Sequence, residues 1–510
     1  MNESPLNAGN LVRRAGLIAG PLLALACYSL LPDRYAADAG NMIEFTHQGR
    51  ATLAMMLWMA AWWMTEAVDV EVTALLPIAL FPLFGISSIA DATKPYASDV
   101  IYLFMGGFVL GLAIQRWGLD RRLAFFTLRL TGAKPAAMSA GLMAAAAFLS
   151  MWISNTACAA IMVPIAISVI NLVLSTRHGS GLGENGDMTA FNQTERNYAT
   201  GLLLGIAYAT SIGGIATLIG SAPNGIAARF IEQTYQHEVT FVKWLMIGLP
   251  FTIIFLPIAW WLITRVIFPA PLEEIPGGRK MLAGEYQKLG PLSRGEMVTL
   301  AVFVCTAMLW IFGGLLREIS FAGMHPLKGL TDSGVAVLAA VALFMLPADR
   351  NGNRAMDWQT ATNLPWGVLI LFGGGLSLAS AVEANGVSQF IGHSTRGLGL
   401  LPPLLMLAAV VTLTVFLSEF TSNTAQVATM TPVLAAMAPA LGMNPQVLVI
   451  VCALSASSAY MMPVGTPPNA IVFSTGLIRM PQMIRAGIML NLAGIALITI
   501  LGWFYIPKLF

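Results

Sequence analysis

Ser150-Met-Trp-Ile-Ser-Asn-Thr156 interrupts an apolar stretch that runs from residue 136 to 174, and this interruption decides the fold. A hydroxyl, an amide and a second hydroxyl in succession are costly in hydrocarbon unless their polar atoms find partners. The apolar arms on either side, 141–149 and 157–170, are each short for a full membrane crossing. The sequence therefore predicts a helical hairpin that enters the membrane and turns near its midplane.

The composition of the chain points to a lipid environment. Hydrophobic residues make up 57% of the 510 positions and charged residues 10%, so a soluble protein of this size would lack the polar side chains to cover its surface. The apolar runs are continuous, whereas the strands of a membrane barrel alternate polar and apolar residues. We therefore expect an all-α polytopic membrane protein with about eleven transmembrane helices and two re-entrant helical hairpins.

The chain also contains an internal duplication. The first motif recurs as Ser418-Glu-Phe-Thr-Ser-Asn-Thr424 at an offset of 268, and Gly220-Ser-Ala-Pro-Asn224 recurs as Gly465-Thr-Pro-Pro-Asn469 at an offset of 245. The glycine-rich segment 102–111 matches 369–378. Three landmarks in the same order indicate two copies, and an odd number of crossings between them inverts the second copy, as in many secondary transporters.

We expect four parts in the chain. Residues 1–48 form an N-terminal cytoplasmic head with the first transmembrane helix, and 49–270 form the first five-helix repeat. Residues 271–297 form a cytoplasmic linker, and 298–510 form the second five-helix repeat.

The distribution of positive charge predicts the orientation. With the N-terminus in the cytoplasm, most of the 27 Lys and Arg fall on cytoplasmic connections, with clusters at 116–134 and 265–294, as the positive-inside rule requires. The apolar stretch up to Leu31 could pass for a signal peptide, but no small-residue cleavage site stands out before Asp33, which favours a retained first helix. We expect a multi-pass protein of the cytoplasmic (inner) membrane.

The hairpin tips carry the predicted chemistry. A tip exposes backbone carbonyls at the end of one helix, which suit a cation, and N–H groups at the start of the next, which suit an anion. The alternative is that Ser154 or Thr156 merely caps the second helix of the hairpin. The same triplet recurs in the second copy, and in both copies a serine stands four residues before it, at Ser150 and Ser418. This repetition favours a ligand site. Each of these serines can add a hydroxyl oxygen to a sodium shell.

The two Gly-Ser/Thr-x-Pro-Asn segments are predicted to break a second helix in each half. Prolines free backbone carbonyls, and Gly220 and Gly465 let the chain leave helical geometry. A simple kink is the alternative, but each break ends in a repeated asparagine, which favours a coordinating loop lining a cavity. The four motifs contain no Lys, Arg or His. An anion would therefore be held by amides, hydroxyls and helix dipoles, with neighbouring sodium ions supplying positive charge.

Other polar residues in the apolar zone allow two interpretations each. Glu66, Asp69 and Glu71 suit a short solvated turn better than a proton relay, and Glu419 suits either hydrogen-bonded anchoring of its helix or proton coupling. The four cysteines lie in apolar segments without ligand-like spacing, which favours small buried hydrophobic side chains over a metal or disulfide role. They are Cys27, Cys158, Cys305 and Cys452.

Two Ser-Asn-Thr tips and two breaks ending in Pro-Asn resemble the signature of the divalent anion/sodium symporter family, from about residue 50 to the C-terminus. The resemblance implies a homodimer in which a transport domain moves elevator-fashion against a fixed scaffold domain. It implies one sodium at Ser150, Ser154, Asn155 and Gly220, and a second at Ser418, Ser422, Asn423 and Gly465. It places substrate carboxylates at Asn155, Thr156, Asn423 and Thr424, with Ser221, Thr466 and Pro467 nearby. At the position of Gly465, bacterial members often carry a small residue that is larger than glycine, such as alanine.

We therefore expect sodium-coupled uptake of C4-dicarboxylates such as succinate, malate and fumarate. A sodium-independent dicarboxylate exchanger, a citrate or sulfate carrier of the same fold, and a channel remain the alternatives. No metalloprotease, nucleophile-elbow or phosphate-loop pattern occurs, so an enzyme is not expected. The expected partners are a small dicarboxylate, sodium, the lipid bilayer and a second copy of the chain, without nucleic acid.

Overall fold

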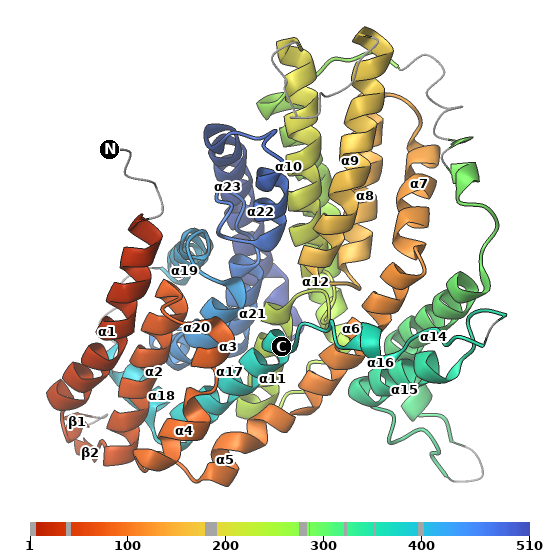
Figure 1. The fold of residues 1–510 in the computed structure, drawn as a ribbon. Coiled ribbons are helices and arrows are strands. Elements are labelled where there is room, and N and C mark those ends of the chain that lie inside the picture. Colours follow the sequence, from red (N-terminus) through yellow and green to blue (C-terminus); the bar gives the residue numbers. More distant parts are fainter. Residues whose placement is uncertain are drawn as a thin grey trace.

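The computed structural model describes residues 7–36, 42–178, 191–274, 283–284, 286–320, 324–350, 352–395 and 402–510. Figure 1 shows a bundle of helices. Within the described residues, nine helices are long and apolar enough to cross a membrane, and five further apolar helices have 10 to 17 residues. The prediction of an all-α polytopic membrane protein is confirmed, and the expected crossings beyond nine correspond to shorter helices such as Asp332–Met345.

The first half begins with one helix and a small β-hairpin, followed by helices only. Its strands β1 (Arg34–Ala36) and β2 (Met42–Glu44) pair antiparallel. Its helices are α1 (Asn7–Leu30), α2 (His47–Thr65), α3 (Val70–Thr73), α4 (Leu76–Leu83), α5 (Ile89–Thr93), η2 (Lys94–Ala97), α6 (Asp99–Arg116), α7 (Leu119–Thr131), α8 (Pro135–Ser150), α9 (Asn155–His178), α10 (Gln193–Ile215), α11 (Ala222–Tyr235), α12 (Phe241–Trp261) and the π-helical η3 (Leu262–Ile267).

The second half follows the predicted linker, of which residues 275–282 and 285 lie outside the described part of the chain. Its helices are α14 (Arg294–Arg317), α15 (Asp332–Met345), α16 (Trp358–Ala361), α17 (Trp366–Ala384), α18 (Val387–Ser394), α19 (Pro403–Ser418), α20 (Asn423–Met437), η5 (Ala438–Leu441), α21 (Pro445–Ala456), α22 (Pro467–Ser474), α23 (Met480–Phe504) and η6 (Ile506–Lys508).

The element order repeats between the halves. In each half a long helix (α6, α17) leads through a short one (α7, α18) into a helical hairpin and then into a broken helix. Gly118 precedes α7 with φ 73°, and Gly386 precedes α18 with φ 71°. These two glycines are 268 positions apart, the offset of the hairpin motifs. Because a left-handed backbone favours glycine, the same turn is built twice.

Both predicted hairpins form. Helix α8 turns into α9 between Ser150 and Asn155, and α19 turns into α20 between Ser418 and Asn423. Helix α9 has 24 residues and continues to His178, so the prediction that both arms of the first hairpin are too short for a full crossing is wrong for this arm. The polar residues after the apolar stretch extend this helix because nothing in them breaks helical geometry.

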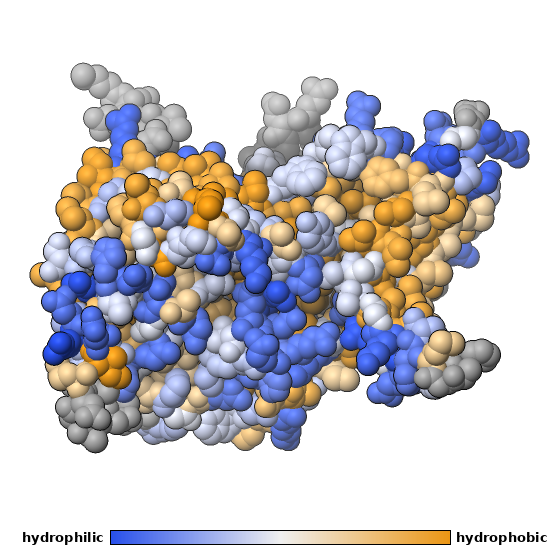
Figure 2. All heavy atoms as spheres, turned by 90° about the horizontal axis from the view of Figure 1, so that it is seen from below, coloured by the Kyte–Doolittle hydropathy of each residue, from blue (hydrophilic) through white to orange (hydrophobic). Residues whose placement is uncertain are grey.

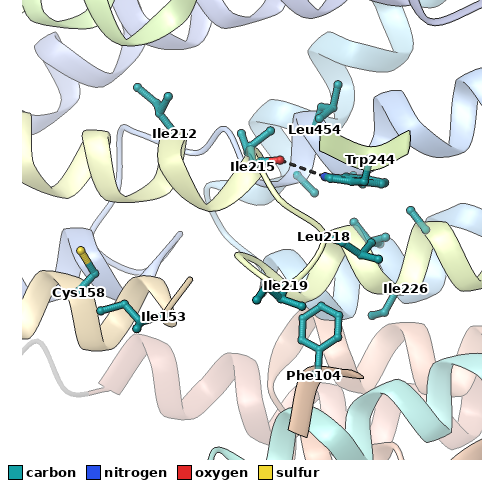
Figure 3. Close-up of a cluster of buried hydrophobic side chains, with 14 of the residues drawn as sticks. Phe104, Ile153, Cys158, Ile212, Ile215, Leu218, Ile219, Ile226, Trp244 and Leu454 are labelled. Atoms are coloured by element: carbon teal, nitrogen blue, oxygen red, sulfur yellow. Dashed lines mark hydrogen bonds between the residues drawn. The ribbon is translucent and has the colours of Figure 1, made fainter. Parts of the chain in front are cut away.

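The broken helices lie at the centre of the molecule. Leu218 and Ile219 are buried in the interval between α10 and α11, and Figure 3 shows Ile219 beside Phe104 of α6. The Trp244 indole Nε1 donates to the Ile215 carbonyl over 3.0 Å, which satisfies an acceptor that the end of α10 exposes. The break therefore lies in dry protein.

The halves interlock through the helices that start at the motifs. Helix α9 of the first half packs against α22 of the second, and α11 of the first packs against α20 and α21 of the second. Figure 1 shows α9, α10 and α22 together in the upper part of the bundle. Each hairpin is thus braced by the broken helix of the other half.

The surface has the distribution expected for a membrane protein. Seen from below, hydrophilic residues spread over the middle and lower part of the face, and hydrophobic residues gather at its upper left and at its right (Figure 2). Cys158 and Cys452 are buried, as predicted, but Cys27 is half-buried and Cys305 is exposed. The prediction of a buried side chain is wrong for Cys305 because it lies on α14, most of whose spanning window faces outward from the protein; an apolar residue there is covered by lipid.

The early carboxylates form the predicted short turn. Glu66 ends α2 with φ 45°, and Asp69 precedes α3. Arg13 of α1 pairs with Glu66 over 3.0 Å, with both side chains substantially exposed. An exposed pair in a turn needs no proton-relay role.

Candidate functional site

The first hairpin tip is built around one buried hydroxyl. Ser150 Oγ donates to Asn155 Oδ1 over 2.6 Å, so the last residue of α8 orients the first residue of α9. Ser150 is fully buried, whereas Asn155 is half-buried. Ser154 Oγ accepts the Ala157 N–H over 3.3 Å, which is the capping role considered from the sequence. Thr156, the last residue of the triplet, is exposed.

The second tip repeats this geometry. Ser418 Oγ donates to Asn423 Oδ1 over 2.7 Å and also lies within hydrogen-bond distance of the Ala456 carbonyl. Ser422 caps α20 through the Ala425 N–H. The serine–asparagine bond is therefore present in both copies, independently of the capping role of the neighbouring serine.

The glycines of the breaks lie against the tip carbonyls. A Cβ on Gly220 would lie 3.0 Å from the Ser150 carbonyl oxygen and 2.6 Å from that of Gly214. A Cβ on Gly465 would lie 3.2 Å from the carbonyl oxygens of Ser418 and Glu419. The structure thus brings each predicted sodium set together within its own half. Gly220 lies closer to its tip carbonyl than Gly465 does to its own.

A threonine joins the first tip to the first break. Thr217 Oγ1 donates to the Met151 carbonyl, and the same oxygen accepts the Gly220 N–H over 3.1 Å. Gly214 also packs directly on Asn155, since a Cβ at Gly214 would lie 2.3 Å from Asn155 Oδ1. The amide of Asn155 is therefore positioned by contacts from α8 and α10 together.

The repeated asparagines after the prolines bind the breaks themselves. Asn224 Nδ2 donates to the carbonyls of Gly214 (2.9 Å) and Thr217 (2.8 Å). Asn469 Nδ2 donates to the carbonyl of Met462 over 3.0 Å and reaches that of Ala459 at 3.4 Å. Both side chains are fully buried. Their amino groups therefore hold the unwound backbone, a role that the sequence did not reveal, while the buried Oδ1 atom of each asparagine has no hydrogen-bond partner among the described residues.

Four helices begin at these motifs. Ser221 precedes α11 and Thr466 precedes α22, and neither side chain caps its helix. With α9 and α20 starting at the tips, four helix N-termini carry partial positive charge at the motifs. Pro467, the first residue of α22, is exposed, and Thr424 is half-buried. Helix N-termini are ready-made anion sites, so the arrangement can hold carboxylates without a basic side chain.

Glu419 is a site residue whose partners the sequence did not reveal. It follows Ser418 at the second tip and occupies the position of Met151 at the first, 268 residues earlier. Its carboxylate accepts hydrogen bonds from the break between α21 and α22 and from Asn491 of α23. The anchoring alternative considered from the sequence is confirmed, but it anchors the break and not only its own helix.

Two related crevices flank the hairpins. One of about 710 Å³ lies between α6, α7 and α9, and one of about 420 Å³ lies between α17, α18 and α20 with part of its wall from α11. Polar residues at matching places, 268 positions apart, line them: Gln115, Asp120 and Arg121 in the first, and Glu383, Ser388 and Gln389 in the second. Burial raises the pKa of the Asp120 carboxyl. The duplication therefore extends to the crevices beside the hairpins, although the charged residues that line the two crevices differ.

Comparison with known proteins gives relatives over nearly the whole chain. The sodium-dependent dicarboxylate transporter SdcS of Staphylococcus aureus strain RF122 is 36% identical over 507 residues, which cover 99% of this chain and 93% of the relative. SdcS of Staphylococcus saprophyticus is 36% identical over 503 residues, covering 98% and 92%. These relatives are transporters and not enzymes.

Solved structures share the fold at low sequence identity. The Alcanivorax borkumensis YdaH transporter aligns with a TM-score of 0.55 at 13% identity, covering 98% of both chains. Neisseria gonorrhoeae MtrF aligns with a TM-score of 0.55 at 12% identity, covering 99% of this chain and 96% of that one. The model of the sodium:sulfate symporter transmembrane region matches residues 42–510. Together with the SdcS relatives, this match shows that the chain belongs to the sodium:sulfate symporter family.

Proposed function

We propose that this protein is a secondary active transporter that couples the uptake of C4-dicarboxylates to sodium. The observation that carries the proposal is the serine–asparagine hydrogen bond found at both hairpin tips, each beside a glycine of a broken helix. The 36% identity to sodium-dependent dicarboxylate transporters over almost the full chain supports the same choice of ion and substrate.

The sodium proposal follows from the oxygen atoms at each tip. The hydroxyl hydrogen of Ser150 is engaged by Asn155, so lone pairs of both side-chain oxygens remain available to a cation. The end of α8 adds backbone carbonyls, and Gly220 brings the break within contact of them. We propose one sodium at Ser150, Ser154, Asn155 and Gly220 and a second at Ser418, Ser422, Asn423 and Gly465. Uncharged oxygen ligands and helix ends at a broken helix are typical of sodium sites in transporters.

The substrate proposal follows from the helix N-termini. One carboxylate of a dicarboxylate would meet Asn155 and Thr156, and the other would meet Asn423 and Thr424. Ser221 and Thr466 support this role because neither hydroxyl is used to cap its helix. Pro467 would line the same pocket. Bound sodium beside these groups would attract the dianion, and the dianion would in turn strengthen sodium binding. This mutual stabilisation couples the two ligands.

We further propose an elevator mechanism with the boundaries expected from the sequence. The repeats 49–270 and 298–510 would each contribute to both domains. Helices α1–α7 and α14–α18 would form the scaffold, and the hairpins with α10–α12 and α21–α23 would form the transport domain. Gly132, which ends α7 with φ 85°, lies at the proposed boundary between the scaffold and the first hairpin and supports this division. A homodimer in the cytoplasmic membrane with a cytoplasmic N-terminus completes the proposal.

Uptake of labelled succinate into proteoliposomes tests the function directly. We expect saturable uptake that requires an inward sodium gradient and is absent without sodium. Uptake that needs internal succinate and ignores sodium would instead identify an exchanger. Competition by citrate or sulfate stronger than by malate would reassign the substrate, and non-saturable flux would identify a channel. Asn155→Ala protein in matched vesicles serves as the inactive control.

A further inference from the structure

The carboxylate of Glu419 lies at the second hairpin tip with almost no exposure, at 1% of its accessible surface. Oε1 accepts from Tyr460 N (2.8 Å), Met461 N (3.0 Å) and Asn491 Nδ2 (2.6 Å). Oε2 accepts from Met461 N and Met462 N, both at 2.9 Å. A single side chain thus gathers three successive N–H groups of the break between α21 and α22.

The partners of Glu419 identify its charge state. Every one of them is a hydrogen-bond donor, so a proton on the carboxyl group would face a donor and displace it. The geometry therefore selects the ionised form, to which such donors bind most strongly. A buried charge without an opposite charge is strongly unfavourable. None of the ion pairs among the described residues includes Glu419, so its counter-charge must come from elsewhere.

The neighbours of Glu419 indicate where that charge binds. Ser418, the preceding residue, holds Asn423 through a 2.7 Å bond. Gly465 lies so close that its Cβ would be 3.2 Å from both Cα and the carbonyl oxygen of Glu419. These three residues, Ser418, Asn423 and Gly465, are members of the second proposed sodium set. The buried negative charge therefore adjoins one proposed sodium site.

In the first half, an uncharged side chain connects the hairpin tip to the broken helix. Met151 stands where Glu419 does, and its carbonyl accepts from Thr217, whose oxygen accepts the Gly220 N–H. The two tips are thus joined to their breaks in different ways, by a neutral hydroxyl in the first half and by a carboxylate in the second. The two proposed sodium sites differ by one fixed negative charge.

We propose that Glu419 is the fixed counter-charge of the second sodium site and makes that site the one with the higher sodium affinity. This inference rests on the proposed function. Both carboxylate oxygens are occupied by N–H groups, so Glu419 acts as a positioning residue and not as a sodium ligand. It holds the break against the tip, and its charge attracts sodium across a few ångströms of dry protein, where electrostatic interactions are strong.

Sodium titrations of uptake into proteoliposomes test the role of this charge. Glu419→Gln keeps the size of the side chain and removes its charge. We expect the half-saturating sodium concentration to rise at least about tenfold, because a neighbouring charge in a medium of low dielectric is worth more than 1.4 kcal/mol. The new amide group also faces N–H donors of the break, so some loss of maximal rate is expected as well, and the rise in half-saturating sodium is the readout that reports the charge. The conservative variant Glu419→Asp should keep half-saturation within about threefold of the original value.

Thr217→Val is the matched control in the first half, since it breaks the neutral connection and leaves charge unchanged. Because Thr217 holds the Gly220 N–H of the first proposed sodium set, this variant should lower thermal stability and raise half-saturating sodium, but by clearly less than Glu419→Gln does. A Glu419→Gln protein with unchanged half-saturation, or with only a reduced maximal rate, would show a purely structural role and overturn the inference. If Glu419→Gln does not fold, a tenfold shift in Glu419→Asp would overturn it equally. An unmodified protein without any sodium dependence would instead refute the proposed function.

Discussion

The hydroxyl of Ser150 donates to Asn155 Oδ1 over 2.6 Å, across the turn between the two helices of the first hairpin. The same bond joins Ser418 to Asn423 at 2.7 Å in the second hairpin. In each case a buried serine fixes an amide whose outer part is accessible. Such a bond pre-orients the amide oxygen, so a ligand need not supply the energy to order it.

Removing either serine hydroxyl should weaken sodium binding without unfolding the protein. Ser150→Ala loses the bond to Asn155, and Ser418→Ala loses the contacts to Asn423 and to the Ala456 carbonyl. Each variant also loses one possible sodium oxygen, and we expect half-saturating sodium in succinate uptake to rise roughly tenfold. Ser139→Ala is the control. Ser139 is also buried on α8, but it donates to the Pro135 carbonyl of its own helix, away from the hairpin tip. Equal effects at Ser139 and Ser150 would argue against a site at the tip.

Loss of the amides themselves should have a larger effect. Asn155→Ala and Asn423→Ala remove the group that the sodium and substrate proposals share, so we expect each to abolish succinate uptake. Both residues begin a helix at an accessible tip, and a truncated side chain there leaves the apolar core intact. Size-exclusion profiles and thermal unfolding of the purified variants should match the original protein. Near-normal uptake by either variant would count heavily against the proposed site.

The two glycines of the breaks should respond differently to alanine. At Gly220 a Cβ would lie 2.6 Å from the Gly214 carbonyl oxygen, a contact that backbone must move to relieve. At Gly465 the nearest atoms would be 3.2 Å away, which small shifts can accommodate. We expect Gly220→Ala to lose uptake and Gly465→Ala to retain most of it. Initial rates at saturating sodium measure both, and a more severe effect at 465 would contradict the packing.

Much of this site could be predicted because its motifs are visible in the local sequence and occur twice. The Ser-Asn-Thr tips and the Gly/Pro breaks are chemical exceptions within apolar stretches, and their recurrence marked them as a pair. The partners of Glu419 could not be found in the same way. They lie 41 to 72 positions away and meet it only after the hairpin, the break and α23 have packed together.

The backbone contacts of Asn224 and Asn469 could not be predicted for a more local reason. Asn224 binds carbonyls seven and ten positions earlier, within the same broken segment. An amide beside unwound backbone can either bind that backbone or face a ligand, and spacing does not distinguish these roles. The length of α9 was likewise missed because its last residues are polar, and polar residues at a membrane surface can continue a helix.

Asn224→Ala and Asn469→Ala should therefore reduce stability. Each leaves two buried carbonyls without their amide donor, at a cost of about 1–3 kcal/mol per group. We expect clearly lower thermal midpoints in detergent than for the original protein. Asn197→Ala is the control, since this amide also donates to a carbonyl, that of Pro269, but at a partly exposed position. Unchanged midpoints for both buried variants would refute the structural role.

Cross-linking should separate elevator movement from ligand binding. Gly375 of α17, in the proposed scaffold, faces Ala428 of α20, in the proposed transport domain, and a Cβ on Gly375 would lie 2.9 Å from that of Ala428. A disulfide joins Cβ atoms about 3.5–4.5 Å apart, so a slight shift permits one. In a background without the four native cysteines, oxidation of the Gly375→Cys/Ala428→Cys pair should arrest uptake, and reduction should restore it.

The control pair tests whether the arrest comes from blocked movement. Gly16 of α1 faces Thr65 of α2 at a similar separation, 2.6 Å between the Cβ positions, and both helices belong to the proposed scaffold. Oxidation of Gly16→Cys/Thr65→Cys should leave uptake intact, because these helices move together. Sodium-dependent thermal stabilisation should persist in both oxidised proteins, since neither pair touches the hairpin tips. Continued uptake by a fully cross-linked 375–428 pair would mean that α20 does not slide along α17, and substrate would then have to cross without an elevator movement.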